Sequence, residues 1–421
     1  MTLHMQWGRA QGGSFRGDWW IGLALAVIAV AFRLYAVRHV YVYQLYGDMF
    51  HYDQTATTLL SRHYFSFWGV TPDAYVTPGY PLFLAACYKI ASWISPHHQF
   101  ALRMASGVQA VLSGTVTAIL YLLGRRVLGV PFAVAVAALW ALYPPAIWSV
   151  TLILTETLFV FFLFLYLWTL VTAMDKQTLV WWSISGLTLG VAALVRPTVL
   201  PLVLLPAGML AWQWWRGGSP MRQIAAAIFV HVIAFLTPLV PWWARNWILL
   251  HQFVATDTEV GNPLLFGSDP KFLSHPLLGR GLTEPQQKHL AIERIIAGFT
   301  HHPILFSRWY TIGKLQYLFS KPWFRPLTGH EPTLFVLWLN VHIVWVVLGA
   351  LGLFLGLFVR EMRLFAGLAL YLVLIQLPFI PVDRYAFPIM PFFFLGVGFL
   401  IQWTLHQSVW RPGWRKRGVI A

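Results

Sequence analysis

The sequence is short of charged residues and has almost no cysteine. Asp, Glu, Lys and Arg make up 10% of the 421 residues, whereas a soluble domain carries about 25%. The single cysteine, Cys87, excludes an internal disulfide and a thiolate metal cluster. The sequence also lacks a Walker A motif and a Rossmann-type glycine fingerprint, so a soluble nucleotide donor is not indicated. The scarcity of charge excludes water as the main solvent of this chain.

Apolar and aromatic residues take the place of the missing charge. The chain is 58% hydrophobic, with a mean hydropathy of +0.64. A helix needs about 20 apolar residues to cross the hydrocarbon of a bilayer. The apolar runs that we assign as spans are Trp19–Val37, Ala101–Leu123, Pro131–Trp148, Leu154–Thr172, Val180–Val195, Pro197–Trp215, Ile224–Trp243, Leu334–Phe358, Leu364–Ile380 and Ala386–His406. The sequence therefore predicts an all-α polytopic membrane protein with about ten transmembrane helices, in a single integral membrane domain over residues 1–421.

The cations outnumber the anions, with 29 Lys and Arg against 14 Asp and Glu and a formal charge of +15. They are scattered between the apolar runs and form no stripe, which argues against a nucleic-acid partner. In a membrane protein they instead report topology, because cytoplasmic loops carry an excess of Lys and Arg.

The apolar segment Pro78–Ile94 decides the topology. Counted as a span, it would give an odd total and reverse every later loop. If it lies along the surface, one side of the membrane collects Arg9, Arg16, Arg125, Arg126, Lys176, Arg216, Arg222, Arg360, Arg363, Arg411, Arg415, Lys416 and Arg417. By the positive-inside rule that side is the cytoplasm. We therefore expect a multi-pass protein of the plasma (inner) membrane with both termini cytoplasmic and a site that faces the outside or the periplasm.

Two outer loops result from this topology, over about residues 38–100 and 245–333. The second is too long for an idle connection. Its Thr283-Glu-Pro-Gln286 segment has the capping-box pattern, and apolar residues follow at helical spacing. These features predict an amphipathic helix there and a further helix over Pro303–Phe319, both as outer juxtamembrane elements.

Ionisable residues gather on the outer side of this topology. They are Asp48, Asp53, Asp73, Glu156, Asp383, Arg196, Arg245 and Arg384. Charged groups at membrane depth are costly and are functional candidates by default. Asp48 follows Gly47 and Glu156 follows Thr155, so each acid has the alternative role of capping a helix or matching its dipole. The arginines have the alternative role of interfacial anchors, although together they would suit a phosphate, which guanidinium binds in a bidentate fashion.

A metal site is a weaker interpretation of the first outer loop. His51 and Asp53 are candidate ligands of a divalent cation together with Asp48, yet one helical face does not present positions i, i+3 and i+5 together. The sequence therefore requires no cofactor, and a divalent cation at His51 and Asp53 stays an open alternative.

An ordered set of short motifs resembles a known family. The set consists of Asp48 to Ala56, Thr77-Pro-Gly-Tyr-Pro-Leu-Phe-Leu84, Leu123-Gly-Arg-Arg126, Leu154-Thr-Glu156, Leu194-Val-Arg-Pro197, Pro241-Trp-Trp-Ala-Arg-Asn246 and Arg384-Tyr385. In this order they resemble the membrane glycosyltransferases of the C superfold, in the group of protein mannosyltransferase-like and aminoarabinose-transferase-like enzymes. The resemblance covers nearly the whole chain.

The resemblance implies a mechanism and a set of site residues. Such enzymes transfer a hexosyl or pentosyl group from a polyprenyl-phosphate carrier at the outer leaflet to a hydroxyl or other nucleophile of a glycan, lipid or protein acceptor. It carries the role of catalytic base to Asp48 and a second acidic role to Glu156. Beside these we assign Tyr52 to the substrate-binding set. Arg196, Arg245 and Arg384 belong to the same set, because a departing phosphate at the outer leaflet needs positive charge nearby. Many members have Asp-Glu where this chain has Asp48-Met49, which weakens the expectation of a cation.

Two other functions remain as alternatives. A transporter or lipid flippase would show polar groups and interrupted helices near the midplane of the bilayer. The charges of this chain sit mostly at one face, and Arg33, within the first span, is an exception that we expect to snorkel outward. A non-catalytic assembly subunit is the second alternative, against which the retained Asp48, Glu156 and arginines argue.

Overall fold

The computed structural model describes residues 18–39, 45–215, 217, 220–275, 278–324 and 333–408. Every regular element in this part of the chain is a helix, which confirms the all-α prediction. The predicted topology signals at Arg9, Arg16 and Arg216 and in the tail from Arg411 lie outside the described residues.

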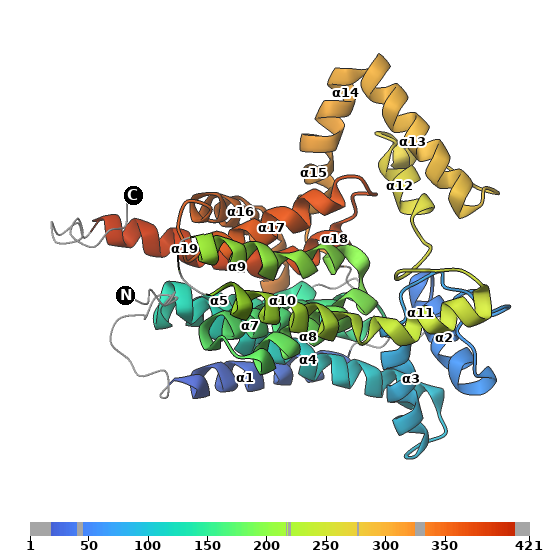
Figure 1. Ribbon diagram of the computed structural model, residues 1–421, viewed down its shortest axis with the longest axis horizontal. Coiled ribbons are helices and arrows are strands. Elements are labelled where there is room, and N and C mark those ends of the chain that lie inside the picture. Colours follow the sequence, from blue (N-terminus) through green and yellow to red (C-terminus); the bar gives the residue numbers. More distant parts are fainter. Residues whose placement is uncertain are drawn as a thin grey trace.

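Long apolar helices run side by side along the long axis of the molecule (Figure 1). The single helices with the length and composition of a span are α1 (Trp19–His39), α4 (His98–Leu128), α7 (Glu156–Lys176), the run of η2 (Pro197–Leu204) into α9 (Leu205–Trp215), α16 (Thr333–Gly356) and the run of α18 (Asp383–Ala386) through η5 (Phe387–Ile389) into α19 (Met390–Ser408). Six such spans are present among the described residues, or up to eight if two bent pairs also cross. The two shorter apolar helices, α8 (Leu179–Val195) and α17 (Arg363–Gln376), fall on the remaining predicted runs.

Prolines account for the two bent pairs. Pro144 and Pro145 open α6 (Pro144–Trp148), and η1 (Ser149–Thr151) follows it, at a bend of 54° from α5 (Val130–Leu142). Pro238 separates α10 (Met221–Leu236) from α11 (Leu239–Leu250), with a bend of 46°. A proline lacks the amide proton and clashes with the preceding turn, so the helix bends where it occurs.

Arg33 does not snorkel, contrary to the sequence-based expectation. Its side chain is fully buried, and Nε donates a hydrogen bond of 2.7 Å to Ser113 Oγ. Nη1 donates to the main-chain oxygen of Ala141 and Nη2 to that of Trp140. These carbonyls belong to the last turn of α5, where main-chain oxygens run short of amide partners, although the oxygen of Trp140 also accepts from the Tyr143 amide at 3.3 Å. Arg33 therefore caps α5 at its break, which is a structural role.

Two ion pairs join neighbouring segments at one end of the bundle. Asp18 pairs with Arg125 at 2.7 Å, and Arg126 pairs with Asp175. The start of α1 and the end of α19 lie at this same end (Figure 1). It is the end that the charge pattern assigns to the cytoplasm.

The opposite end carries α2 (Asp48–Arg62) and α3 (Gly79–Ser92) (Figure 1). The 14 residues of α3 are too few to span a bilayer, which agrees with its expected surface position. Thr77 Oγ1 donates to the main-chain oxygen of Val195 at 2.9 Å. A Cβ at Gly79 would lie 2.6 Å from the main-chain oxygen of Leu194, so only glycine fits there. The Thr-Pro-Gly-Tyr-Pro turn therefore docks α3 onto the end of α8, immediately before Arg196.

The long segment that the sequence predicts to lie outside folds into helices at the same end. They are α12 (Gly261–Gly267), η3 (Phe272–Ser274), α13 (Glu284–His301), α14 (Pro303–Arg308), η4 (Trp309–Gly313) and α15 (Lys314–Phe319). The capping box at Thr283 and Gln286 is confirmed, as is the helical character of Pro303–Phe319. Figure 1 shows α13 and α14 as a bent arm that projects to the side of the bundle.

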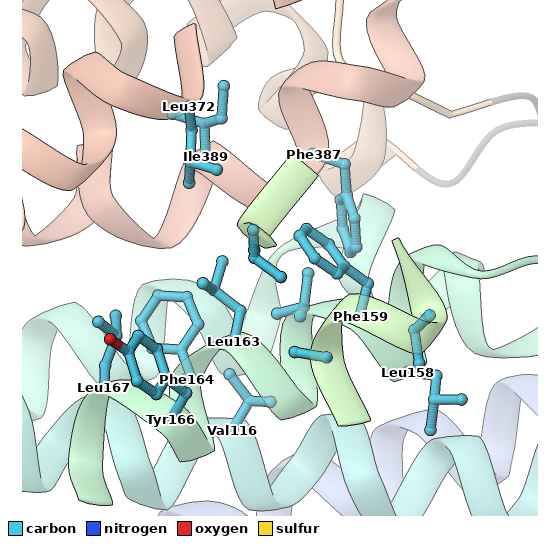
Figure 2. Close-up of a cluster of buried hydrophobic side chains, with 14 of the residues drawn as sticks. Val116, Leu158, Phe159, Leu163, Phe164, Tyr166, Leu167, Leu372, Phe387 and Ile389 are labelled. Atoms are coloured by element: carbon cyan, nitrogen blue, oxygen red, sulfur yellow. The ribbon is translucent and has the colours of Figure 1, made fainter. Parts of the chain in front are cut away.

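The core packs around α7, whose side chains are buried on most of its surface. In Figure 2 Phe159 of α7 and Phe387 of η5 point toward one another, above Leu163 and Phe164. Without a hydrophobic driving force between helices in lipid, such close packing is what holds them together. Phe159 lies three residues after Glu156, and Phe387 three residues after Arg384, so this contact also brings those two charged residues together.

Candidate functional site

Asp48 is the first residue of α2, and Gly47 precedes it with a φ of 55°. A positive φ favours glycine, which explains the Gly-Asp sequence at this turn. The N-cap of α2 is Gly47 and Asp48 is the first helical residue, so the alternative role of helix cap is wrong. Its Oδ2 instead lies 2.8 Å from Nη1 of Arg384, and 49% of the side chain is exposed. The carboxylate is therefore both oriented and accessible.

Glu156 begins α7 and lies between two guanidinium groups. Its Oε1 lies 2.5 Å from Arg384 Nε and also pairs with Arg196 Nη2. Arg196 Nε donates a hydrogen bond of 2.9 Å to Thr155 Oγ1. The Glu156 side chain is 1% exposed. A charge so deeply buried costs free energy unless opposite charges lie close to it, and both cations come from helix ends that meet here.

The ring of Tyr385 contacts both arginines. Its ring centroid lies 5.7 Å from the guanidinium carbon of Arg196 and 5.7 Å from that of Arg384. Contacts of this kind between a cation and an aromatic face are worth about 0.5–2 kcal/mol. Asp48, Arg384, Glu156 and Arg196 thus form a continuous chain of ion pairs, which we call the charge relay.

Tyr52 lies one helical turn after Asp48. Its side chain is buried and its ring packs against that of Tyr80, with centroids 5.2 Å apart. Burial, followed by the charge of Asp48, raises the pKa of Tyr52 well above its ordinary value. The hydroxyl therefore keeps its proton and can serve as a hydrogen-bond donor at the edge of the charge relay.

Arg245 lies outside the charge relay. Its Nη1 donates to the main-chain oxygen of Asp73 at 2.7 Å, and its Nη2 to that of Phe65 at 2.9 Å. Its guanidinium also lies over the ring of Trp242, 5.1 Å from the centroid. These contacts tie α11 to the first outer loop.

His51 and Asp53 point to different partners. Asp53 Oδ1 accepts a hydrogen bond of 2.7 Å from Tyr88 and lies 2.9 Å from Nε2 of His98. His51 packs against the rings of Phe67 and Trp68, which also contact each other. The described residues contain no group of three or more His, Cys, Asp and Glu side chains that could hold a metal ion.

Glu259 is a site residue that the sequence analysis did not single out. Its main-chain amide donates to the oxygen of Tyr75 at 3.1 Å, in the first outer loop. Burial, together with the neighbouring carboxylates of Asp48, Asp257 and Glu284, raises the pKa of Glu259 to about 8. Its carboxyl group is thus close enough to Asp48 for the two to repel. The scarcity of acidic residues in the chain is the signal that points to it.

The arrangement suits chemistry on a phosphate and a hydroxyl. Arg384 Nη2 and Arg196 Nη1 make no hydrogen bond with a described residue, so each guanidinium keeps donors for an anion. The exposed carboxylate of Asp48 lies next to them and can accept a proton. A phosphate bound by the arginines and a hydroxyl bound by Asp48 would therefore lie next to each other.

A family model described as dolichyl-phosphate-mannose-protein mannosyltransferase matches residues 76–242. The matched range includes Glu156 and Arg196. A comparison with curated proteins gives no match.

Several solved structures are similar to this chain. The chain is similar to the archaeal oligosaccharyltransferase AglB from Archaeoglobus fulgidus, in complex with an inhibitory peptide and a dolichol-phosphate, at 13% identity and a TM-score of 0.53, over 97% of this chain and 53% of that one. A complex of the oligosaccharyltransferase from the same organism with Zn and sulfate gives a TM-score of 0.55 at 15% identity, over 92% and 49%. ArnT from Cupriavidus metallidurans bound to undecaprenyl phosphate gives a TM-score of 0.41 at 12% identity, over 91% and 78%.

The chain spans about half the length of the archaeal oligosaccharyltransferase. What the two share is the arrangement of helices. The family match covers the helices from α3 to the start of α11, and the shared fold extends over nearly the whole chain. Together they agree with the resemblance found in the sequence: part of the chain matches the mannosyltransferase family model, and nearly the whole chain shares the fold of the archaeal oligosaccharyltransferase.

Proposed function

We propose that this protein is a glycosyltransferase that moves a sugar from a polyprenyl-phosphate carrier to an acceptor nucleophile at the outer face of the membrane. The observation that carries the proposal is the charge relay, in which an exposed carboxylate, Asp48, is held by an arginine that also contacts a buried acid. The family match and the dolichol-phosphate complex of the similar oligosaccharyltransferase support the choice of donor.

Asp48 acts as the general base. The acceptor oxygen attacks the anomeric carbon from the face opposite the phosphate, the bond from that carbon to the phosphate oxygen breaks, and Asp48 takes the acceptor proton. The transfer inverts the anomeric configuration. A positioned base typically contributes about 10²–10⁴-fold to the rate, and the ion pair with Arg384 keeps the Asp48 carboxylate oriented for this step.

Arg384 and Arg196 stabilise the departing phosphate. A phosphate gains negative charge as it leaves, so cations fixed beside it act more strongly in the transition state than in the ground state. Glu156 holds both guanidinium groups, and its burial between them favours a positioning role over proton transfer. The arginines are thereby set in place before the donor binds.

An apolar cavity supports a lipid carrier. Its volume is about 490 Å³, and residues of η4, α15, α16, α17 and α19 line it. The α15 wall also packs against α18, the helix that carries Arg384. The isoprenoid tail of a carrier can lie in this cavity while its phosphate reaches the arginines. Ala369 and Val373, from the α17 wall, would contact that tail.

The alternative functions gain no specific support. Arg33 donates hydrogen bonds to carbonyls of a helix end, so this buried charge, of the kind that a transporter would use, has a structural explanation. The exposure of Asp48 next to two arginines is more than an assembly subunit requires.

A transfer assay tests the proposal. Purified protein in nanodiscs is incubated with a panel of radiolabelled polyprenyl-phosphate sugars, hexosyl and pentosyl, together with membrane glycolipid and glycan acceptors. We expect one donor to yield labelled product with loss of the glycosyl phosphate. The Glu293→Gln variant, which changes an exposed acid on α13, should match the parent. If no donor in the panel is bound or consumed, the proposed function is wrong.

A further inference from the structure

An exposed tryptophan lies beside the charge relay. Trp68 of the first outer loop has 51% of its surface exposed. Its ring contacts that of His51 at 4.9 Å and that of Tyr75 at 5.1 Å between centroids. His51 lies on α2, three residues after Asp48. We call His51, Trp68 and Tyr75 the aromatic face.

The loop that presents this face is held firmly. Asp73 Oδ2 accepts a hydrogen bond of 2.8 Å from the amide of Phe67, and the Phe67 ring stacks on Tyr75 at 5.1 Å. The Tyr75 hydroxyl donates to Glu284 Oε1 at 3.2 Å. The exposure of Trp68 is therefore not that of a loose loop tip. A rigid aromatic side chain presented in this way offers contact area at little cost in conformational entropy.

Glu259 adds a polar group to the aromatic face. Its amide is bound to the Tyr75 oxygen, and its carboxyl group makes no hydrogen bond with a described residue. Because burial raises the pKa of Glu259 to about 8, the carboxyl group carries a proton at neutral pH. It can then both donate and accept hydrogen bonds, as a hydroxyl-rich partner requires.

We propose that the aromatic face and Glu259 form the acceptor subsite and that the acceptor presents a neutral sugar ring there. The inference rests on the proposed function, since it names the substrate that Asp48 deprotonates. The C–H face of a sugar packs on an aromatic ring, and its hydroxyl groups hydrogen-bond to a carboxyl group. A ring stacked on Trp68 places one hydroxyl toward Asp48, while the donor phosphate occupies the arginine side.

Two other interpretations of Trp68 make different predictions. An interfacial anchor would meet lipid headgroups, as tryptophans at membrane surfaces commonly do. A subsite for a cationic acceptor would use the ring and the nearby carboxylates to hold an ammonium group. The hydrogen bonds from Tyr75 to Glu284 and from the loop amide to Asp73 already fix two of those carboxylates, which favours a neutral ring.

Saturation-transfer NMR on the full chain in nanodiscs tests the subsite without a donor. The probes are methyl mannoside, methyl glucoside, N-acetylglucosamine and, as the cationic competitor, ethanolamine. We expect saturation to pass from the protein to the ring protons of at least one sugar. This NMR signal should be retained in Trp68→Phe and lost in Trp68→Ala. Trp93→Ala removes another exposed outer tryptophan and serves as the matched control. The inference would be overturned if ethanolamine were the only probe to show saturation transfer. It would also be overturned if Trp68→Ala and Trp93→Ala lost the sugar signal equally.

Turnover kinetics separate this inference from the proposed function. Trp68→Ala and Glu259→Leu should each raise the acceptor KM about tenfold, the effect of about 1.4 kcal/mol, with the donor KM unchanged. Glu259→Gln, whose amide still donates and accepts, should raise it less. A change in the donor KM alone would contradict the acceptor role. Sugar binding at Trp68 without any transfer from polyprenyl-phosphate sugars would instead keep the subsite and refute the proposed transferase activity.

Discussion

Arg384 Nη1 lies 2.8 Å from Asp48 Oδ2 although 336 residues separate them in the sequence. The same guanidinium contacts Glu156, so one arginine joins the start of α2 to the start of α7. Arg384 contacts the exposed acid Asp48 with Nη1 and the buried acid Glu156 with Nε. The position of the proposed base therefore depends on the position of Glu156 in the core. Loss of Arg384 should therefore weaken the stabilisation of the leaving phosphate and also disturb the orientation of Asp48.

The Arg384→Ala variant should lose turnover by about 10²–10³-fold, the usual effect of removing one preorganised donor to a developing charge. Arg384→Lys keeps the charge but not the planar fork and should lose less. A double-mutant cycle with Asp48→Asn measures the coupling, which we expect at about 0.5–3 kcal/mol. Additive effects of the two changes would mean that the ion pair does not serve catalysis.

Arg245→Ala should act through the first outer loop. Without the guanidinium, the main-chain oxygens of Phe65 and Asp73 lose their donor, at a cost of about 1–3 kcal/mol. We expect faster amide hydrogen exchange over residues 65–75 and a smaller effect on donor KM than Arg196→Ala causes. An equal weakening of donor binding by the two alanine variants would restore Arg245 to the phosphate site.

Glu259 predicts a pH dependence of stability. Its pKa is raised from 4.5 to about 8 in the folded protein, so the folded chain retains a proton that the unfolded chain releases. The associated stability is present below about pH 4.5 and is lost as the pH rises through about 8. Thermal unfolding between pH 5 and 8.5 should thus show a smaller decrease in Glu259→Gln than in the parent. An unchanged slope, as expected for the exposed Glu293→Gln, would place Glu259 in water.

Topology can be tested with single cysteines in a Cys87→Ser background, in which the buried native thiol is absent. Lys288→Cys on α13 should react with a membrane-impermeant maleimide in intact cells, because it belongs to the outer arm. Lys176→Cys, at the last residue of α7, should react after permeabilisation only. The reverse labelling pattern would invert the positive-inside assignment.

The sequence was sufficient to find the charge relay but not to sort its members. Against spans that are almost free of charge, Asp48, Glu156, Arg196 and Arg384 each stand out as outer ionisable groups. Arg245 stands out for the same reason, and only the structure shows that it donates its hydrogen bonds to loop carbonyls instead. Pattern reasoning identifies the residue types, whereas partner choice depends on tertiary contacts.

Glu259 shows where the pattern provides least information. It lies between α11 and α12 in a segment without helical periodicity, and its position is set by one hydrogen bond to Tyr75, far away in the sequence. Arg33 was misassigned for a related reason, since the break in α5 that it caps is made by prolines more than a hundred residues later.

The central claim is that Asp48 removes the acceptor proton, and the Asp48→Asn variant tests it most directly. Asparagine keeps the shape of the side chain and can accept a hydrogen bond from Arg384, but it cannot take a proton. Single-turnover transfer and donor binding are measured on the same nanodisc samples. The account predicts that donor binding persists while transfer falls by at least about 10²-fold. Transfer at the parental rate in Asp48→Asn would contradict it.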